Sequence, residues 1–257
     1  MLIDSHAHLH FDRFDEDRDE VIARAHDRGV NQIVTIGTHR ESSQAAIELA
    51  ERHESIYATA GVHPLAVEKF QSEDWQSFES MWTHPDVVAI GETGLDYYYT
   101  PETADQQRQL FERHLSAGQQ FNLPVVVHIR DAFEDAFELL EAHLGDAGGI
   151  VHCFTGGPEE CARALELGMY ISLSGIATFK NAKALRDAIP MVPQDRLLVE
   201  TDSPYLAPIP HRGKRCEPGF VYDTAKVVAA LRGDDFETLC AYTVENTRKI
   251  FAKMKPI

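Results

Sequence analysis

The segment Leu2-Ile3-Asp4-Ser5-His6-Ala7-His8 lies at the start of the chain and determines how the rest of it is interpreted. Its first two residues favour an extended strand, and residues two apart in a strand point to the same face. His6 and His8 should therefore project side by side from the end of a first strand. Two neutral imidazoles suit a borderline divalent cation such as zinc or manganese, and Asp4 is close enough to orient one of the rings. A lone His-x-His pair is a weak signal, so its value depends on what later strands carry.

Beyond this segment the chain alternates short β-branched runs with longer amphipathic runs. Strands are expected at residues 2–4, 32–36, 56–59, 87–90, 124–128, 150–152, 170–173 and 196–200. Helices are expected near residues 15–28, 40–53, 72–82, 103–121, 132–144, 158–167, 182–189, 222–231 and 236–251. Eight βα units without a linker predict an α/β protein with a single (β/α)8 TIM barrel over residues 1–257. A doubly wound parallel sheet is the structural alternative.

The composition is that of an ordinary globular protein with a sizeable core, at 44% hydrophobic and 25% charged residues. No apolar run approaches the roughly 18 residues that cross a bilayer. The first strand begins at Leu2, so no signal peptide fits before it. The four cysteines show no CxxC spacing, as is usual for reduced thiols. We therefore expect a cytoplasmic monomer without membrane association.

The net charge of −17 limits how the protein can bind a polyanion. Nonspecific coating of nucleic acid depends on an excess of Lys and Arg, whereas this chain has 24 Lys and Arg against 41 Asp and Glu. Local binding stays open if metal ions and a few basic side chains provide a positive field at one cleft.

Ligand-type residues follow the expected strands, where a barrel of this kind places its active site. A single strand-end histidine such as His63 is more often a packed or solvated residue than a ligand. A joint pattern over five strands is much harder to ascribe to coincidence. That pattern consists of His6, His8, Glu92, His128, His152 and Asp202.

The motifs around these residues resemble those of the TatD family of metal-dependent deoxyribonucleases, in order and over nearly the whole chain. They are Asp4-Ser5-His6-Ala7-His8, Ile90-Gly91-Glu92-Thr93-Gly94-Leu95-Asp96-Tyr97, His128-Ile129-Arg130, His152-Cys153-Phe154-Thr155-Gly156 and Glu200-Thr201-Asp202-Ser203-Pro204-Tyr205-Leu206. The resemblance implies that His6, His8 and Asp202 hold one metal, that His128 and His152 hold a second, and that Glu92 bridges them. Cys216 stands where the family suggests Asn, and Leu65 where many members carry His; both departures concern substrate preference.

These residue types suit phosphodiester hydrolysis. Two cations roughly 3.5–4 Å apart can provide a nucleophile at neutral pH and clamp the attacking and leaving oxygens. Glu92 and Asp202 are the expected catalytic residues, and Asp202 can take the proton of the attacking water. We predict a deoxyribonuclease that needs two divalent ions (Zn, Mn, Co, Ni or Mg) and acts as an exonuclease on single-stranded or frayed DNA ends.

Two other functions remain open from the sequence. The same metals could hydrolyse small phosphodiesters, lactones or amides, which an acidic surface would suit. Many related barrels bridge their metals with a carboxylated Lys, so Glu92 favours the nuclease. A catalytically dead barrel that serves as a binding module is disfavoured by the complete set of ligands.

Substrate contacts are expected from residues near the mouth of the barrel. Tyr97-Tyr98-Tyr99 is either a stacking platform for bases or a loop that covers the barrel, and residues 211–215 form either a phosphate clamp or a solvated loop. Stacking on a terminal base is assigned to Tyr97 or Phe154. Phosphate and other substrate contacts are assigned to His63, Arg130, Lys180, Arg212, Lys214 and Arg215.

Overall fold

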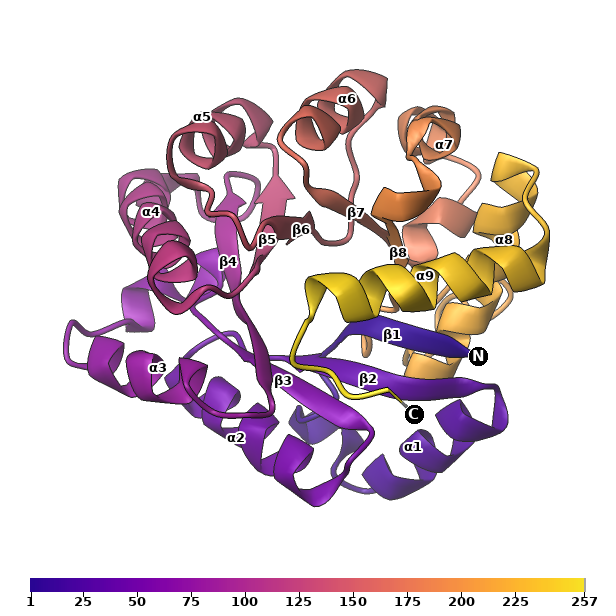
Figure 1. Cartoon of the computed structure of the whole chain (residues 1–257), viewed down its shortest axis with the longest axis horizontal. Coiled ribbons are helices and arrows are strands. Elements are labelled where there is room, and N and C mark those ends of the chain that lie inside the picture. The colour runs from indigo at the N-terminus through magenta and orange to yellow at the C-terminus, as the bar shows by residue number, and fades with distance from the viewer. Residues whose placement is uncertain (257) are drawn as a thin grey trace.

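Eight parallel strands form a barrel in the computed structural model, which describes residues 1–256 (Figure 1). Each strand pairs with the next in sequence order, so the doubly wound alternative is wrong. Backbone hydrogen bonds from Asp202 N to His6 O (2.9 Å) and from His8 N to Ser203 O (2.7 Å) close the barrel. The strands are β1 Leu2–Ala7, β2 Val30–Ile36, β3 Ile56–Ala60, β4 Val87–Asp96, β5 Val125–Arg130, β6 Gly149–Val151, β7 Tyr170–Leu173 and β8 Leu197–Val199.

A ring of helices surrounds the strands and confirms the predicted alternation (Figure 1). The α-helices are α1 Arg18–Asp27, α2 Arg40–Arg52, α3 Asp74–Trp82, α4 Ala104–Phe121, α5 Phe133–His143, α6 Pro158–Glu166, α7 Lys183–Ala188, α8 Val221–Arg232 and α9 Phe236–Ile250. Short 3-10 turns lie at Asp12–Phe14, Pro64–Lys69, Pro101–Thr103, Gly175–Thr178, Ile189–Met191, Gln194–Arg196 and Pro218–Phe220. Within the described residues, no helix has both the length and the hydropathy of a bilayer-spanning segment.

The inside of the barrel is apolar towards the amino ends of the strands. Every strand contributes one or two buried residues to this cluster, which also includes Val244 and Ile250 of α9 and the following Phe251 and Met254. The strand residues are Ile3, Val34, Ile36, Tyr57, Val88, Ala89, Val126, Ile150, Tyr170 and Leu198. Burial of this layer stabilises the barrel at one end, which leaves the carboxyl ends of the strands free to carry polar groups.

β1 and β4 are longer than the sequence predicted, so that His6 and Glu92 lie within strands and His8 directly follows β1. β4 was expected to end at Ile90, yet it continues past Glu92 and pairs with β5 as far as Asp96 and Arg130. Gly94 makes this pairing possible because its φ is +131° and a Cβ there would overlap the carbonyl oxygen of His128. The close approach of the two strands places Glu92 and His128 beside one another.

Replacement of Gly94 by alanine tests this close approach. Gly94→Ala should lower the free energy of unfolding by about 2 kcal/mol or more, because crowding adds to backbone strain. Gly233→Ala is the matched control, since Gly233 follows the end of α8 at φ +73° and a Cβ there would have no atom within 4 Å. The free energy of unfolding of this variant should fall by only about 1 kcal/mol. Urea unfolding of both variants measures the difference. Equal losses would mean that the β4–β5 contact tolerates a side chain.

Candidate metal centre

Seven side chains meet at the carboxyl ends of the strands, and Glu92 lies among them. Its Oε1 atom is 2.8 Å from His152 Nε2, 3.2 Å from His128 Nδ1 and 3.4 Å from His63 Nε2. Its Oε2 atom is 3.4 Å from His6 Nε2 and 3.7 Å from His8 Nε2. The two oxygens of one carboxylate therefore face two different groups of imidazoles.

Asp202 belongs to the group on the Oε2 side. Its Oδ1 atom lies 3.3 Å from His8 Nε2 and 3.7 Å from His6 Nε2. The barrel closure between β1 and the segment after β8 brings these residues together. The structure thus brings together all six residues that the resemblance implied as metal ligands, and His152 lies close to His6 and Asp202 as well as to Glu92.

Several buried atoms of the cluster lack a protein partner. Both ring nitrogens of His6 and the Oε2 atom of Glu92 make no hydrogen bond within residues 1–256. His6 and Glu92 are only 1% and 2% exposed. Buried polar atoms without partners are costly and usually bind water or an ion. This donor set of imidazoles and carboxylates fits divalent cations.

Three of the rings use one nitrogen for a hydrogen bond to an outer acceptor, so that the other nitrogen faces Glu92. His8 Nδ1 donates to Ile36 O (2.9 Å), and His152 Nδ1 donates to Glu200 Oε1 (3.2 Å). His128 Nε2 donates to Asp96 Oδ2 (3.1 Å). In a neutral imidazole, the second nitrogen is then an acceptor. This arrangement, with an outer acceptor that fixes the tautomer, is typical of metal-binding histidines.

His63 has the opposite arrangement. The backbone N–H of Leu65 donates to His63 Nδ1 at 3.0 Å, so the proton of the neutral ring is on Nε2, which faces Glu92. His63 therefore presents a hydrogen-bond donor to the cluster, although it is close enough to be grouped with the ligands. This geometry agrees with a contact to substrate better than with a bond to a cation.

The carboxylates of the cluster are ionised. Burial raises the pKa of Glu92, but the imidazoles around it outweigh burial and hold that pKa well below its ordinary value. Burial likewise raises the pKa of Asp202, and the hydrogen bond from His8 with the nearby imidazole charges lowers it overall. Burial and the charge of His152 lower the pKa of His6, which favours its neutral, ligating form.

Sequence reasoning missed Asp96 and Glu200 as partners of the ligands. Both lie an even number of residues from a predicted ligand, since Asp96 is four residues after Glu92 and Glu200 is two residues before Asp202. Counting by two along the strand could have found both. The expectation that Asp4 orients a ring is wrong, because its carboxylate accepts instead from the backbone N–H groups of Thr201 (2.9 Å) and His6 (3.3 Å).

The two residues predicted to stack on a base differ in exposure, since Tyr97 is partly exposed and Phe154 is buried. Tyr97 donates its hydroxyl to Asp135 Oδ2 (2.7 Å), and burial together with that carboxylate raises the pKa of Tyr97 to about 12. Phe154 is 2% exposed and packs against Phe133.

The basic side chains expected to contact phosphate differ in their surroundings. Arg130 lies over the rings of Tyr98 and Tyr99, and Arg212 lies 4.1 Å from the ring centroid of Phe179. Arg215 is bound by Asp17 and Glu217. Two further lysines, Lys180 and Lys214, are exposed.

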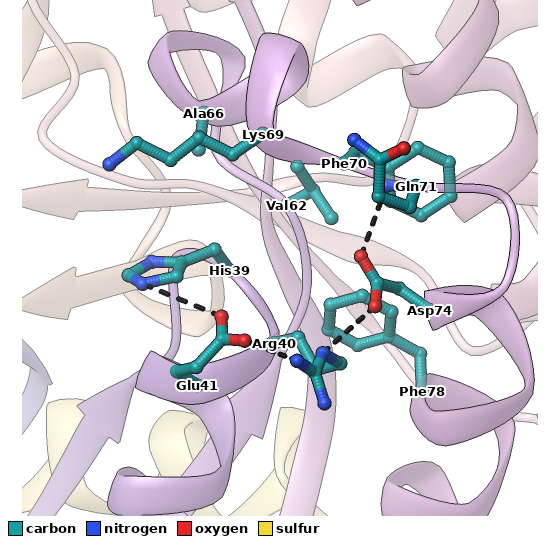
Figure 2. Close-up of a pocket in the computed structure, with 10 residues that line it drawn as sticks. All are labelled: His39, Arg40, Glu41, Val62, Ala66, Lys69, Phe70, Gln71, Asp74 and Phe78. Atoms are coloured by element: carbon teal, nitrogen blue, oxygen red, sulfur yellow. Dashed lines mark hydrogen bonds and ion pairs between the residues drawn. The ribbon is translucent and has the colours of Figure 1, made fainter.

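A pocket of about 420 Å³ lies between the start of α2 and the segment that follows β3 (Figure 2). Val62, which precedes His63, lies in its wall with Phe70 and Phe78. Figure 2 shows the polar rim, where Arg40 Nε pairs with Asp74 Oδ1 at 2.8 Å. The pocket therefore combines an apolar wall with fixed charged groups, and none of the seven cluster side chains is among its lining residues.

Comparison with known proteins agrees with this geometry. The family described as TatD related DNase matches residues 3–252. An uncharacterized metal-dependent hydrolase, YcfH of Escherichia coli K12, is 43% identical over 98% of this chain and 96% of its own length. A 3'-5' ssDNA/RNA exonuclease TatD of Shigella flexneri is 36% identical over 97% and 98% of the two chains. The solved structure of a TatD homologue from E. coli K12 superimposes with a TM-score of 0.94 at 28% identity, over 98% of each chain.

The contact between His152 and Glu200 can be tested by Glu200→Gln. The amide retains the volume and an acceptor oxygen but removes the negative charge behind His152. We expect divalent-ion affinity to fall about 10- to 100-fold, as is usual when such an outer partner is lost. Chelator competition measures the affinity, and the exposed Glu245→Gln in α9 is the matched control. Unchanged affinity would show that Glu200 does not tune the ligand.

Proposed function

Because the chain belongs to the TatD family and is a metal-dependent hydrolase, we propose that it cleaves phosphodiester bonds at single-stranded or frayed DNA ends with two divalent ions. The observation that carries this proposal is the division of the cluster by Glu92, whose Oε1 and Oε2 atoms face different imidazoles. A relative named as an exonuclease on single-stranded DNA and RNA supports the choice of substrate.

Two sets of residues would hold the ions. His6, His8 and Asp202 surround one position and His128 with His152 the other, with Glu92 between them. The mixture of imidazole and carboxylate suits Zn, Mn, Co or Ni at least as well as Mg. Bound divalent ions would supply a nucleophile at neutral pH and relieve charge on the phosphoryl oxygens.

The side chains of the protein would perform the remaining steps. Asp202 is 14% exposed, more than Glu92, so its carboxylate is the one that can accept the proton of an attacking water. The Nε2–H group of His63 would donate to a phosphoryl oxygen. Arg130, Lys180, Arg212 and Lys214 would contact neighbouring phosphates. Arg215 is held by two carboxylates, so we assign it to fixing the loop.

A second candidate function is the hydrolysis of a small phosphodiester, lactone or amide. The pocket in Figure 2 is lined by Val62, the residue before His63, but by none of the seven cluster side chains. Its volume of about 420 Å³ falls in the usual range for small-molecule sites. The net charge of −17 also disfavours extended contact with a polyanion. A nuclease needs the basic loop residues, whereas a small-molecule hydrolase does not, and this difference separates the two functions.

The metal content and the role of Glu92 form one prediction. Protein purified without chelator should contain about two divalent ions per chain. Glu92→Gln removes the negative charge shared by both positions, so both ions should be lost and activity should fall by several orders of magnitude. Elemental analysis and circular dichroism measure metal content and folding, with Glu245→Gln as control. Near-native turnover and full metal content in Glu92→Gln would remove Glu92 from the mechanism.

The substrate class forms a second prediction. The wild-type protein should shorten a labelled single-stranded oligonucleotide from an end and hydrolyse a chromogenic phosphodiester, but not a lactone or an amide. Arg212→Ala combined with Lys214→Ala should raise KM for the oligonucleotide, since only that substrate has neighbouring phosphates. Initial rates on both substrates measure the effect. If lactones or amides are the better substrates, or if the double variant leaves oligonucleotide KM unchanged, the nuclease proposal loses its support.

A further inference from the structure

Tyr98, Tyr99 and Arg130 form an exposed aromatic surface at the carboxyl ends of β4 and β5, here called the tyrosine platform. The two rings are 57% and 58% exposed, unusual for large apolar side chains. The Arg130 Cζ atom lies 4.2 Å from the ring centroid of Tyr98 and 4.5 Å from that of Tyr99. The guanidinium therefore covers part of each ring and brings a positive charge to the surface.

The platform lies next to the candidate metal centre. Arg130 follows His128 by two residues in β5, so both side chains project from the same face of the strand, about 7 Å apart along it. Arg130 pairs in register with Asp96 at the end of β4. A ligand on the platform would thus be adjacent to the ions that His128 helps to hold.

The buried carboxylate of Asp96 fixes both the tyrosine platform and the ring of His128. Asp96 Oδ1 accepts hydrogen bonds from the backbone N–H groups of Tyr98 (3.1 Å) and Tyr99 (2.9 Å). Its Oδ2 atom accepts from His128 Nε2 at 3.1 Å. Asp96 is 1% exposed, and its own N–H donates to Gln107 (2.7 Å). The rings are therefore presented by a rigid turn whose position is tied to that of a metal ligand.

We propose that an unpaired base of a single-stranded nucleic acid stacks on the tyrosine platform beside the metal centre. Every base has a flat face that stacks on an aromatic ring or a guanidinium plane. Arg215 is bound by two carboxylates. Within residues 1–256 Arg130 forms no ion pair, so the charge of Arg130 is available to a phosphate. This inference rests on the proposed function, and it replaces Tyr97 and Phe154 as the stacking residues.

Equilibrium binding to the metal-loaded protein tests the platform. The probe is a short fluorescent oligothymidylate with phosphorothioate linkages that resist hydrolysis, compared with an abasic oligomer of equal length. Combined Tyr98→Ala and Tyr99→Ala should weaken binding of the oligothymidylate about tenfold or more, because one base–aromatic stack is lost. The abasic oligomer should bind weakly, and with the same affinity, to the wild-type protein and to the double alanine variant.

The matched control is the combined Tyr98→Phe and Tyr99→Phe variant, which keeps the rings and should bind as the wild type does. Both changes affect exposed side chains, and circular dichroism verifies folding. Wild-type binding by the alanine variant, or equal affinity of wild type for the two oligomers, would overturn the platform even if DNA ends are still hydrolysed. Tyrosine-dependent binding without hydrolysis of any oligonucleotide would instead leave the platform standing and overturn the proposed nuclease.

Discussion

The architecture of the site depends on one buried carboxylate surrounded by imidazoles. Glu92 is 2% exposed and lies within 3.7 Å of ring nitrogens from five histidines. A buried carboxylate is tolerated only when nearby positive charges and hydrogen bonds compensate for its lost hydration. The outer partners Asp96, Glu200 and the Ile36 carbonyl oxygen turn three of the rings so that their other nitrogens point inward, where neutral rings would offer lone pairs to a divalent cation.

The barrel separates this costly arrangement from the packing that stabilises the fold. The amino ends of the strands enclose an apolar layer from Ile3 to Leu198, closed by Phe251 and Met254 after α9. The carboxyl ends hold the polar cluster. Substitutions in the cluster can therefore change metal binding while the apolar layer still holds the barrel together, as expected for enzymes of this architecture.

Sequence patterns predicted the alternation of strands and helices, and the spacing of His6 and His8 predicted one face of the site. These features are local, since a period of two residues requires no knowledge of the fold. The orientation of His63 depends on the N–H of Leu65, and the burial of Phe154 depends on packing against α5. Both depend on contacts that periodicity does not encode. The length of β4 depends on Gly94, which accepts a backbone conformation and a close contact with His128 that other residues do not.

The closure of the barrel has a consequence for biosynthesis. The hydrogen bonds between Asp4 and Thr201 link residues 197 positions apart, and His6 meets Asp202 through the same junction. A chain that emerges from the ribosome amino end first carries His6 from the beginning but lacks Asp202 until most of its length has been translated. Contacts of such wide sequence separation form late, after the entropy of closing a long loop has been overcome. Nascent chains therefore lack a complete metal centre, and the ability to bind both ions distinguishes fully synthesised, closed barrels from partial ones.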